Sequence, residues 1–491
     1  MSSSVLGSSE RPLRVAIIGS GPSGFYAVDA LFKVDGLHVR CDVFDRLPVP
    51  YGLVRGGVAP DHQKMKSVTR QYEKIAADDR FRFFGNVMLG KDLTVEDLLE
   101  HYDQIVYAVG NEEARELGIP GEHLEGVFSA TEFVYWYNGH PDFCDRKFDL
   151  SKARRIAVVG NGNVAIDVCR ILIQDPERLA STDIADYALE TLRNSAVEEV
   201  ILLGRRGPAQ VAFSPKEIKE LAELEGVELF VRPGPMELDP VSRKWLESGS
   251  APKSATKNVA FLTKASEQEP ADGRRLDCRF LVSPVELTGV DGALTGVRLQ
   301  RNLIYATDDG TPRPKGSDVY VDEEVQMIFK AIGYRGTPIP GVPFHEDWGI
   351  IPNDEGRVTN EGETVAHQYV VGWAKRGPEG LIGTNNPDSK ATVANMVEDL
   401  AGAVVEPLSE AEAGGICKLL KSRDVRFVTF ADWQKLDGLE LQRGEASGQV
   451  RTKFTQLEDV LRALDKLDTG PGDRDAIPEP GLLGLGQEPS R

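Results

Sequence analysis

A chain of 491 residues is too long for one ordinary hydrophobic core, so its length predicts two or three domains. The net charge of −20 argues against a nucleic-acid-binding protein, because binding to phosphate depends on Lys and Arg. No apolar run approaches the roughly 20 residues that span a bilayer, and the five cysteines form no CxxC pair, so no redox dithiol and no local iron–sulfur or zinc motif is predicted.

The stretch from Met1 to Arg14 has neither the apolar core of a secretory signal nor the Arg-rich amphipathic pattern of a transit peptide. We therefore expect a cytoplasmic protein. The sequence leaves its oligomeric state open.

The first motif is an apolar strand, Leu13 to Ile18, followed by a glycine-rich turn and a helix to about Lys33. In a dinucleotide-binding turn, Gly19 permits the tight bend, Gly21 lets the backbone approach a pyrophosphate, and Gly24 allows the helix to pack closely. The next strand, from Val39, ends at Asp45, which is placed to accept hydrogen bonds from ribose hydroxyls. The alternative is a structural strand–turn–helix without a ligand.

A second copy of this motif consists of a strand over 155–159, a turn containing Asn161, Gly162, Asn163 and Val164, and a helix to about Leu172. Its following strand, 199–203, ends in Arg205 and Arg206 instead of an acid. Paired guanidinium groups bind a 2′-phosphate, so this turn favours NADP over NAD, the alternative being a solvated basic turn. We therefore expect FAD at the first motif and NADPH at the second.

Apolar strands joined by helices predict a doubly wound α/β fold with two Rossmann-like dinucleotide-binding domains. Buried strands over 104–110 and 325–333 are interpreted as the two crossings between them, so that the NADP domain is inserted in the FAD domain. The polar stretch from Pro233 to Arg275 is expected to form strands and loops. Two short helices are expected after residue 406, over 409–422 and 454–467, with Trp433 as an anchor between them. The predicted units are a discontinuous FAD-binding domain (11–110 and 332–405), an NADP-binding domain (111–331), a C-terminal extension (406–467) and a disordered tail (468–491).

Two loops carry residues suited to a planar ring. Pro48 and Pro50 stiffen a loop whose glycines let backbone pass close to a ring, although a structural turn is the alternative. Trp373, between a buried strand and a glycine-rich loop, could stack on flavin or nicotinamide or lie in the core. Asn386 or Asp388 is expected to cap a helix to about Leu400, whose N-terminus would face the flavin.

Three longer segments, over residues 48–66, 204–217 and 372–389, together resemble the adrenodoxin reductase family, which are ferredoxin–NADP⁺ reductases of the glutathione-reductase-like superfamily. The resemblance runs from about Leu13 to Val405, and the region beyond it is similar to the C-terminal extension of the actinobacterial members. It implies an oxidoreductase that takes hydride from NADPH and passes single electrons to an acidic ferredoxin, which in turn can feed a cytochrome P450.

The resemblance also implies particular contacts, and no metal. The FAD contacts that it implies are Ser23, Asp45, Leu53, Val87, Trp373, Gly380, Leu381 and Ile382. The implied NADP contacts are Asn161, Gly162, Asn163, Val164, Arg205, Arg206, Glu217 and Gly380. Family members usually carry Glu at the position of Asp45, so this chain departs from the pattern there. His62 is implied to lie with Glu217 near the nicotinamide–flavin junction, with a purely structural histidine as the alternative.

Other functions were weighed on the same residues. A chain like the small subunit of glutamate synthase needs cysteine-rich cluster motifs, and a thioredoxin reductase needs CxxC; the sequence has neither. A flavin-bearing binding protein without turnover is the alternative from another class, and the intact Arg205 and Arg206 and the Trp373 loop argue against it. NADPH oxidase or quinone reductase activity is possible as a side activity of an exposed flavin. Arg206, Lys216 and Lys219 are candidates for a ferredoxin-docking patch, although KEIKEL is also typical of a solvated helix face.

Overall fold

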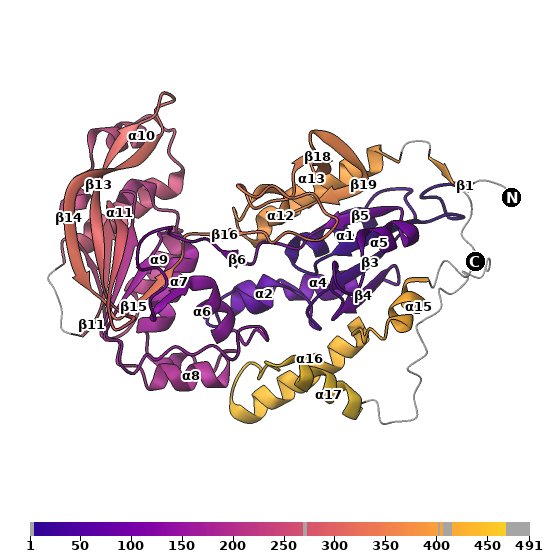
Figure 1. Cartoon of the computed structure of the whole chain (residues 1–491), viewed down its shortest axis with the longest axis horizontal. Coiled ribbons are helices and arrows are strands. Elements are labelled where there is room, and N and C mark those ends of the chain that lie inside the picture. Colours follow the sequence, from indigo (N-terminus) through magenta and orange to yellow (C-terminus); the bar gives the residue numbers. More distant parts are fainter. Residues whose placement is uncertain (1–3, 269–272, 401–402, 406–414, 468–491) are drawn as a thin grey trace, which may run out of the picture.

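The computed structural model describes residues 4–268, 273–400, 403–405 and 415–467, and it has two lobes joined by two short strands (Figure 1). The first lobe is built on a sheet whose strands come from residues 13–107 and 353–370. The second lobe is built on a sheet whose strands come from residues 127–330. Two parallel sheets in one chain confirm the predicted α/β class. Within the described ranges, no helix combines the length and apolar character that crossing a membrane would require.

The first lobe contains a seven-stranded sheet in the order β17-β18-β19-β5-β2-β3-β4, in which the five strands from β19 to β4 are parallel. Alternate residues of β2 enter two different cores: Val15 packs toward α1, α4 and α13, and Ala16 packs toward α5. This burial on both faces explains the continuous apolar strand. The strands are β2 (Leu13–Ile18), β3 (Val39–Asp45), β4 (Phe81–Gly85), β5 (Gln104–Tyr107), β17 (Asn353–Asp354), β18 (Arg357–Asn360) and β19 (Glu363–Val370). The helices are α1 (Pro22–Phe32), α2 (Leu53–Gly56), α3 (Gln63–Lys66), α4 (Thr69–Ala76), α5 (Val95–His101), α12 (Trp373–Arg376) and α13 (Asn385–Glu398).

The second lobe contains a six-stranded parallel sheet in the order β10-β11-β9-β8-β15-β7. Helices cover one face, and a three-stranded antiparallel sheet, β12-β13-β14, packs on the other through residues such as Leu287 and Leu299. The parallel strands are β7 (Val127–Ser129), β8 (Arg155–Val159), β9 (Glu199–Gly204), β10 (Val227–Val231), β11 (Arg274–Phe280) and β15 (Met327–Lys330), and the antiparallel ones are β12 (Val282–Val290), β13 (Ala293–Ala306) and β14 (Pro312–Glu324). The helices are α6 (Ala130–Tyr137), α7 (Asn163–Ile173), α8 (Asp186–Arg193), α9 (Pro215–Ala222), α10 (Pro240–Glu247) and α11 (Lys253–Ser266).

The chain passes between the lobes along β6 (Glu113–Ala114) and β16 (Tyr334–Arg335), which pair in antiparallel fashion. A further antiparallel pair, β1 (Ser4–Val5) with β20 (Val404–Val405), lies at the outer end of the first lobe (Figure 1). The lobes are thus joined covalently by two short strands, and side chains must supply the rest of the contact between them.

One sequence-based prediction fails in the second lobe. The stretch from Pro233 to Arg275, expected to form strands and loops, contains two helices, α10 and α11. The polar composition hid a buried stripe on α11, formed by Ala255, Asn258, Leu262 and Ala265 at helical spacing. Small and polar residues can bury a helix face: Asn258 Nδ2 donates to the carbonyl oxygen of Phe213 (3.0 Å), while Asn258 Oδ1 has no partner among the described residues.

The described part of the extension, residues 415–467, forms three helices beneath the first lobe: α15 (Gly415–Ser422), α16 (Phe430–Ser447) and α17 (Leu457–Leu467) (Figure 1). Trp433 is buried as predicted, but it lies inside α16, which the sequence analysis missed, and not between helices. Gly438 and Gly444 disguised this helix, and Gly444 is there because a Cβ atom would lie 2.4 Å from the Arg451 Cα atom. The helix predicted over 454–467 begins at Leu457. Residues 409–414 of the other predicted helix and the tail 468–491 lie outside the described residues.

Replacing Gly24 by Ala tests the packing of the first turn. A Cβ atom at Gly24 would lie 2.2 Å from the carbonyl oxygen of Gly19, so α1 must move off the end of β2. We expect Gly24→Ala to lower the free energy of unfolding by about 3 kcal/mol, measured by denaturant titration. Gly438→Ala is the control, because a Cβ atom there meets no described atom within 4 Å in the middle of a helix, and it should stabilise by up to about 1 kcal/mol. Equal effects of the two changes would contradict the packing argument.

Candidate active site

The turn between β2 and α1 forms an open cradle at the start of a helix. Gly19 has φ +109°, and Gly24 lies directly against it, so both positions require glycine. A Cβ atom at Gly21 would meet no described atom within 4 Å, so the side of the turn that faces away from the core is open. Gly21 is also the N-cap of α1 and has no side chain to bond the first N–H groups of the helix. These free N–H groups and the helix dipole suit an anionic group such as a pyrophosphate.

Two other segments approach this cradle closely through their backbones. A Cβ atom at Gly52 (φ +48°) would lie 3.0 Å from the Gly21 Cα atom, and one at Gly372 (φ +72°) would lie 2.6 Å from Ser23 Oγ. Leu53 begins α2 immediately after the first of these contacts, and Trp373 begins α12 immediately after the second. The structure therefore brings Gly21, Ser23, Leu53 and Trp373 around one turn, as the sequence predicts for a single ligand.

Asp45 stands at the end of β3 beside the same turn. Its Oδ2 atom accepts hydrogen bonds from the backbone N–H (2.9 Å) and the hydroxyl of Ser20, and its Oδ1 atom accepts from Leu47 N (2.9 Å). The carbonyl oxygen of Asp45 accepts from the backbone N–H of the buried Val87 (2.9 Å). The short carboxylate thus holds the turn in shape, and its contact with a ribose stays a prediction.

The loop around Trp373 is anchored to α13 in a way that the sequence analysis did not foresee. Neither Asn386 nor Asp388 is the N-cap: α13 begins at Asn385, after Thr384. Asp388 instead accepts a hydrogen bond from Gly372 N (2.7 Å) and pairs with Lys375 (3.2 Å). The predicted capping role is therefore wrong, because the partner of this carboxylate is sixteen residues away in the loop that precedes Trp373.

Trp373 itself is half-buried. Its indole Nε1 donates to the carbonyl oxygen of Glu379 (3.2 Å), and its ring centroid lies 5.6 Å from that of Tyr334 in β16. The segment that follows is open: Gly380 (φ +88°) is exposed, Leu381 is 63% exposed, and Ile382 is half-buried in a 3₁₀ turn before α13. This segment lies next to a linker strand and can contact a ligand from either lobe.

The turn between β8 and α7 repeats the arrangement of the first. Gly160 has φ +140°, and a Cβ atom there would lie 2.2 Å from the carbonyl oxygen of Ala331. Gly162, the N-cap of α7, is open, since a Cβ atom would meet no described atom within 4 Å. Asn161 Nδ2 is buried and has no hydrogen-bond partner among the described residues, whereas Asn163 Oδ1 accepts from Ser214 N (2.8 Å). Val164 is half-buried and packs against the core of the lobe. An unpaired buried amide beside an open helix terminus indicates a polar ligand.

Arg205 and Arg206 follow β9 on a turn whose backbone is bonded by residues from other segments of the chain. Asn302 Nδ2 donates to the carbonyl oxygen of Arg205 (2.8 Å), and Leu281 N donates to that of Arg206 (3.1 Å). Burial, together with the positive charges of Arg205 and Arg313, lowers the pKa of Arg206. Arg206 Nε is buried without a partner among the described residues.

Arg313, in β14, was missed by the sequence analysis because it lies more than a hundred residues after the motif and carries no local signal. Within the described ranges, none of Arg205, Arg206 and Arg313 forms an ion pair with a carboxylate, although the chain is strongly acidic. Three unpaired cations around one turn indicate an anion-binding site.

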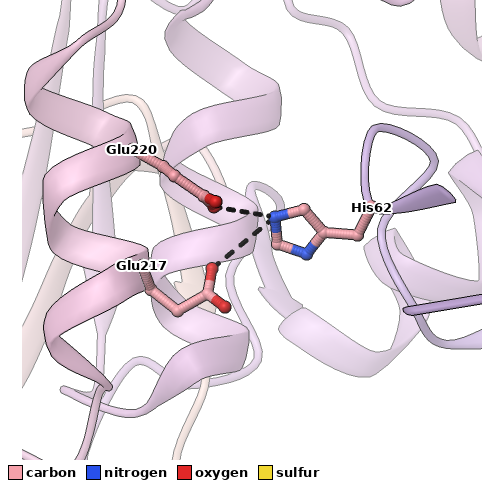
Figure 2. Close-up of side chains that lie close together, drawn as sticks. All are labelled: His62, Glu217 and Glu220. Carbon is pink, nitrogen blue, oxygen red and sulfur yellow. Dashed lines mark hydrogen bonds and ion pairs between the residues drawn. The ribbon is translucent and has the colours of Figure 1, made fainter. Parts of the chain in front are cut away.

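His62 meets the second lobe at the junction between the lobes (Figure 2). It precedes α3 in the first lobe, and its Nε2 atom lies 3.1 Å from Glu220 Oε2 and 3.6 Å from Glu217 Oε2, both on α9. The structure therefore brings His62 and Glu217 together across the junction, as the resemblance implied. Glu220 was not among the predicted site residues, although it lies three residues after Glu217 and therefore on the same face of α9.

A network of charges surrounds this contact. Asp61 forms a bidentate ion pair with Arg170 of α7 (2.7 and 3.0 Å), and Arg170 also binds Asp167 (2.7 Å) and lies 3.5 Å from Glu217. Burial and the charge of Asp167 raise the pKa of Glu217, against the opposing charges of His62 and Arg170. Burial disfavours ionised Asp61, but the hydrogen bonds and charge of Arg170 outweigh it and lower the pKa of Asp61.

His62, Glu217 and Glu220 offer donor atoms within 4.8 Å of one another, which is close enough to consider a metal ion. However, Glu220 also pairs with Lys216 (3.1 Å), and Glu217 lies beside Arg170. Each carboxylate already has a positive side chain beside it, so the arrangement is that of an ion-pair network that joins the lobes.

Comparison with known proteins shows relatives over nearly the whole chain. The pyridine nucleotide-disulphide oxidoreductase family matches residues 13–226. The NADPH-ferredoxin reductase FprA of Mycobacterium leprae is 45% identical, with 91% of this chain and 97% of that protein covered. The mitochondrial NADPH:adrenodoxin oxidoreductase of Arabidopsis thaliana is 40% identical, with 93% and 96% covered. The structure of Mycobacterium tuberculosis FprA in complex with NADPH matches with a TM-score of 0.86 at 41% identity, covering 92% of this chain and all of that one. The similarity thus spans both lobes.

Removing Arg170 tests the network at the junction. Arg170 is 3% exposed, so Arg170→Met leaves three carboxylates short of their buried cation and should lower the free energy of unfolding by about 3–5 kcal/mol at neutral pH. The lowered pKa of Asp61 stabilises the fold above the unfolded-state pKa of Asp, about 4, and this contribution is lost as pH falls. The deficit of the variant should therefore shrink in acid, measured by denaturant titration at several pH values.

The matched control is Arg193→Met, which breaks the exposed ion pair with Glu177 (2.7 Å) and should change the free energy of unfolding far less, because water screens an exposed pair. A deficit of Arg170→Met that is as small as the control's, or that does not change with pH, would contradict the role given to Arg170.

Proposed function

The chain belongs to the adrenodoxin reductase family of NADPH–ferredoxin reductases, and we propose which of its residues carry that family's reaction. It is an FAD- and NADPH-dependent oxidoreductase that transfers electrons to a ferredoxin-type protein. The observation that carries the assignment of residues is the pair of open helix N-termini, one beside a carboxylate and one beside three unpaired arginines.

The first turn fits FAD. Gly19, Gly21 and Gly24 shape a cradle for the pyrophosphate, and Ser23, Leu53, Val87 and the backbone near Trp373 surround it. We propose that Asp45 binds the adenosine ribose, and that Gly380, Leu381 and Ile382 line the flavin end. When bound, FAD accepts a hydride from NADPH and releases the two electrons one at a time.

The second turn fits NADPH. Gly162, Asn163 and Val164 begin α7, where free N–H groups can bind the pyrophosphate, and the unpaired Asn161 amide can donate beside them. Arg205 and Arg206 are proposed to bind the 2′-phosphate, and Arg313 adds a third positive charge. The desolvated, unpaired Arg206 Nε gains a partner only when an anion is bound, which favours NADPH over NADH.

We propose that His62 and Glu217 orient the reacting rings and relay protons. Hydride transfer from NADPH abstracts no proton, so no general base is required of them. Because His62 comes from the first lobe and Glu217 from the second, their contact would hold the two lobes, and with them the two ligands, at a fixed distance. Proximity of this kind is a large part of the rate in reactions between two bound groups.

Thiol chemistry receives no support from the structure. All five cysteines lie in described ranges and are free thiols, and burial raises the pKa of each. A thiol with a raised pKa is a poor nucleophile and a poor redox group at neutral pH. The match to a family named for disulphide oxidoreductases therefore reflects the shared fold.

For the ferredoxin we propose a docking surface different from the one expected at the outset. Of the predicted patch, Lys216 pairs with Glu220, and the carboxylate lowers the positive potential around this lysine. The segment 240–266, α10 and α11, instead exposes Arg243, Lys244, Lys253, Lys257 and Lys264 against one acidic residue, Glu247. Such a local concentration of positive charge can steer an acidic partner despite the net charge of the whole chain. A cytochrome P450 downstream of the ferredoxin stays a prediction.

The first test is an anaerobic titration of the purified yellow protein with NADPH and with NADH, following the visible flavin absorbance. NADPH should bleach the flavin stoichiometrically and NADH far more weakly. Arg206→Ala should reduce the preference for NADPH about 10- to 100-fold, since it removes a charge-assisted hydrogen bond worth about 1.5–3 kcal/mol. Arg313→Ala should reduce the preference by a smaller factor in the same direction. Arg154→Ala, an exposed arginine paired with Glu198, is the control and should leave the preference unchanged.

A colourless protein, or a flavin that NADPH does not bleach, would refute the two-site assignment and favour a binding protein without turnover.

The docking surface is tested by charge reversal. Lys253→Glu with Lys257→Glu should raise the KM for an acidic ferredoxin several-fold at low ionic strength, and the difference should shrink as salt is added. Flavin reduction by NADPH should not change. The comparison is Lys216→Glu with Lys219→Glu, on the patch first predicted from sequence, and a larger effect there would return the docking surface to α9.

A further inference from the structure

A buried cluster of charges joins the C-terminal extension to both lobes. The extension contributes Lys453, whose side chain is 2% exposed, and the second lobe contributes Asp183, 4% exposed. The first lobe contributes Lys66, 11% exposed, from the end of α3. We propose that Lys453 is a positioning residue that sets the place of His62 through Asp183 and α3, an inference that rests on the role proposed above for His62.

Lys453 touches all three parts of the molecule. Its Nζ atom lies 2.8 Å from Asp183 Oδ2, and it donates to the carbonyl oxygens of Asn138 (3.0 Å) and Arg55 (3.4 Å). Asn138 follows α6 in the second lobe, and Arg55 lies in α2 of the first lobe. One ammonium group therefore bonds to both lobes at once. This contact is separate from the two short strands that link the lobes covalently.

Asp183 transmits this contact to α3. Its carboxylate accepts from Gln63 Nε2 (2.7 Å), at the start of the helix, and from Lys66 Nζ (2.7 and 2.8 Å), at its end. His62 is the N-cap of the same helix, and its carbonyl oxygen accepts from Met65 N (2.9 Å). A helix of four residues has little stability of its own, so these side-chain contacts determine its position. The ring of His62 then extends to α9 on the opposite side.

The energetics require all members of the cluster. Burial, together with the charges of Lys66 and Arg55, lowers the pKa of Lys453 to about 7, with Asp183 opposing. The positive charges of Lys453 and Lys66 outweigh burial and lower the pKa of Asp183. Removing one partner of a buried pair leaves the other uncompensated, which is more costly than the net worth of the pair. The neighbouring contacts of the extension share this design, because the buried Glu440 of α16 binds Arg55 and Arg451.

The extension contacts the first lobe at a second point, in the segment that contains Tyr51 and Leu53. Trp433 packs edge-on against Tyr51 (5.8 Å between centroids), and Arg55 lies over its ring (5.0 Å). Tyr51 has φ +86°, an unfavourable conformation for a residue with a side chain, so its neighbours must hold it in place. Contacts with α16 and with Lys453 thus hold the segment from Tyr51 to Lys66, which carries Leu53 and His62.

The test is Lys453→Met, which removes the charge and shortens the unbranched side chain by one heavy atom. We expect the rate constant of flavin reduction by NADPH to fall about 10- to 100-fold, because His62 loses its alignment. The rate at which the reduced enzyme, prepared with dithionite, passes electrons to ferricyanide should not change. In the His62→Gln background, the further effect of Lys453→Met should be less than about 2-fold, since both changes act on one contact. Additive losses, or equal losses in both half-reactions, would mean a general structural role and overturn the proposal.

A second readout does not depend on turnover. Amide hydrogen exchange of the peptide that contains residues 62–66 should become at least about 10-fold faster in Lys453→Met, and it should not change in Lys418→Met, an exposed lysine of α15. Unchanged exchange in α3 would overturn the proposal even if the rate falls. If the wild-type flavin is not reduced by NADPH, the proposed function fails, while the exchange experiment still decides whether Lys453 positions α3.

Gln63→Leu guards against a misfolded Lys453 variant. It breaks the bond between Asp183 and the start of α3 at a half-buried site and leaves the buried ammonium in place. It should reproduce the loss in hydride transfer and the faster exchange of α3. Wild-type behaviour in both measurements would overturn the proposal.

Discussion

The ion pair between Asp61 and Arg170 is the contact on which the rest of the site depends. The two dinucleotide turns lie in different lobes, and the lobes are linked covalently by two short paired strands. A redox reaction between two bound cofactors needs their rings at a fixed distance, so noncovalent contacts at the junction must hold it. The bidentate geometry of Arg170 gives direction as well as attraction, and it places the helix that carries it against the loop of His62.

Joining two lobes through charged side chains requires their desolvation, and ion pairing offsets the free energy that this costs. Asp61, Asp167, Arg170 and Glu217 are withdrawn from water, and each ionised group is expensive there unless a partner is close. Each of these groups has a partner of opposite charge, although three carboxylates share the single cation of Arg170. At the ligand turns, Asn161 Nδ2 and Arg206 Nε are buried without described partners. Unpaired polar atoms destabilise the empty protein, and a ligand that pairs them gains that free energy on binding.

What the sequence could predict follows from the range of each interaction. The two turns were predictable because local backbone geometry requires their glycines. Gly19 and Gly160 have positive φ, and a Cβ atom at Gly21 or Gly162 would occupy the open side of the turn. The partner of Asp388 and the contribution of Arg313 were not, since each depends on a segment that is distant in sequence or on another strand. The helices α11 and α16 were missed for a different reason. Their buried faces use Ala, Asn, Gly and Glu, which a hydrophobicity pattern does not count.

The extension explains why such residues occur in a helix core. A purely apolar α16 could cover the first lobe, but it could not bind the backbone and charges of the junction. Glu440 binds Arg55 from within α16, and Lys453 binds Asn138 after the chain has turned back along this helix, where Gly444 leaves room for Arg451. Charged groups in this position fix a single arrangement of the loop from Tyr51 to Lys66, because a shifted arrangement would leave them unpaired. The polar core of the extension thus determines the position of a loop that belongs to the site.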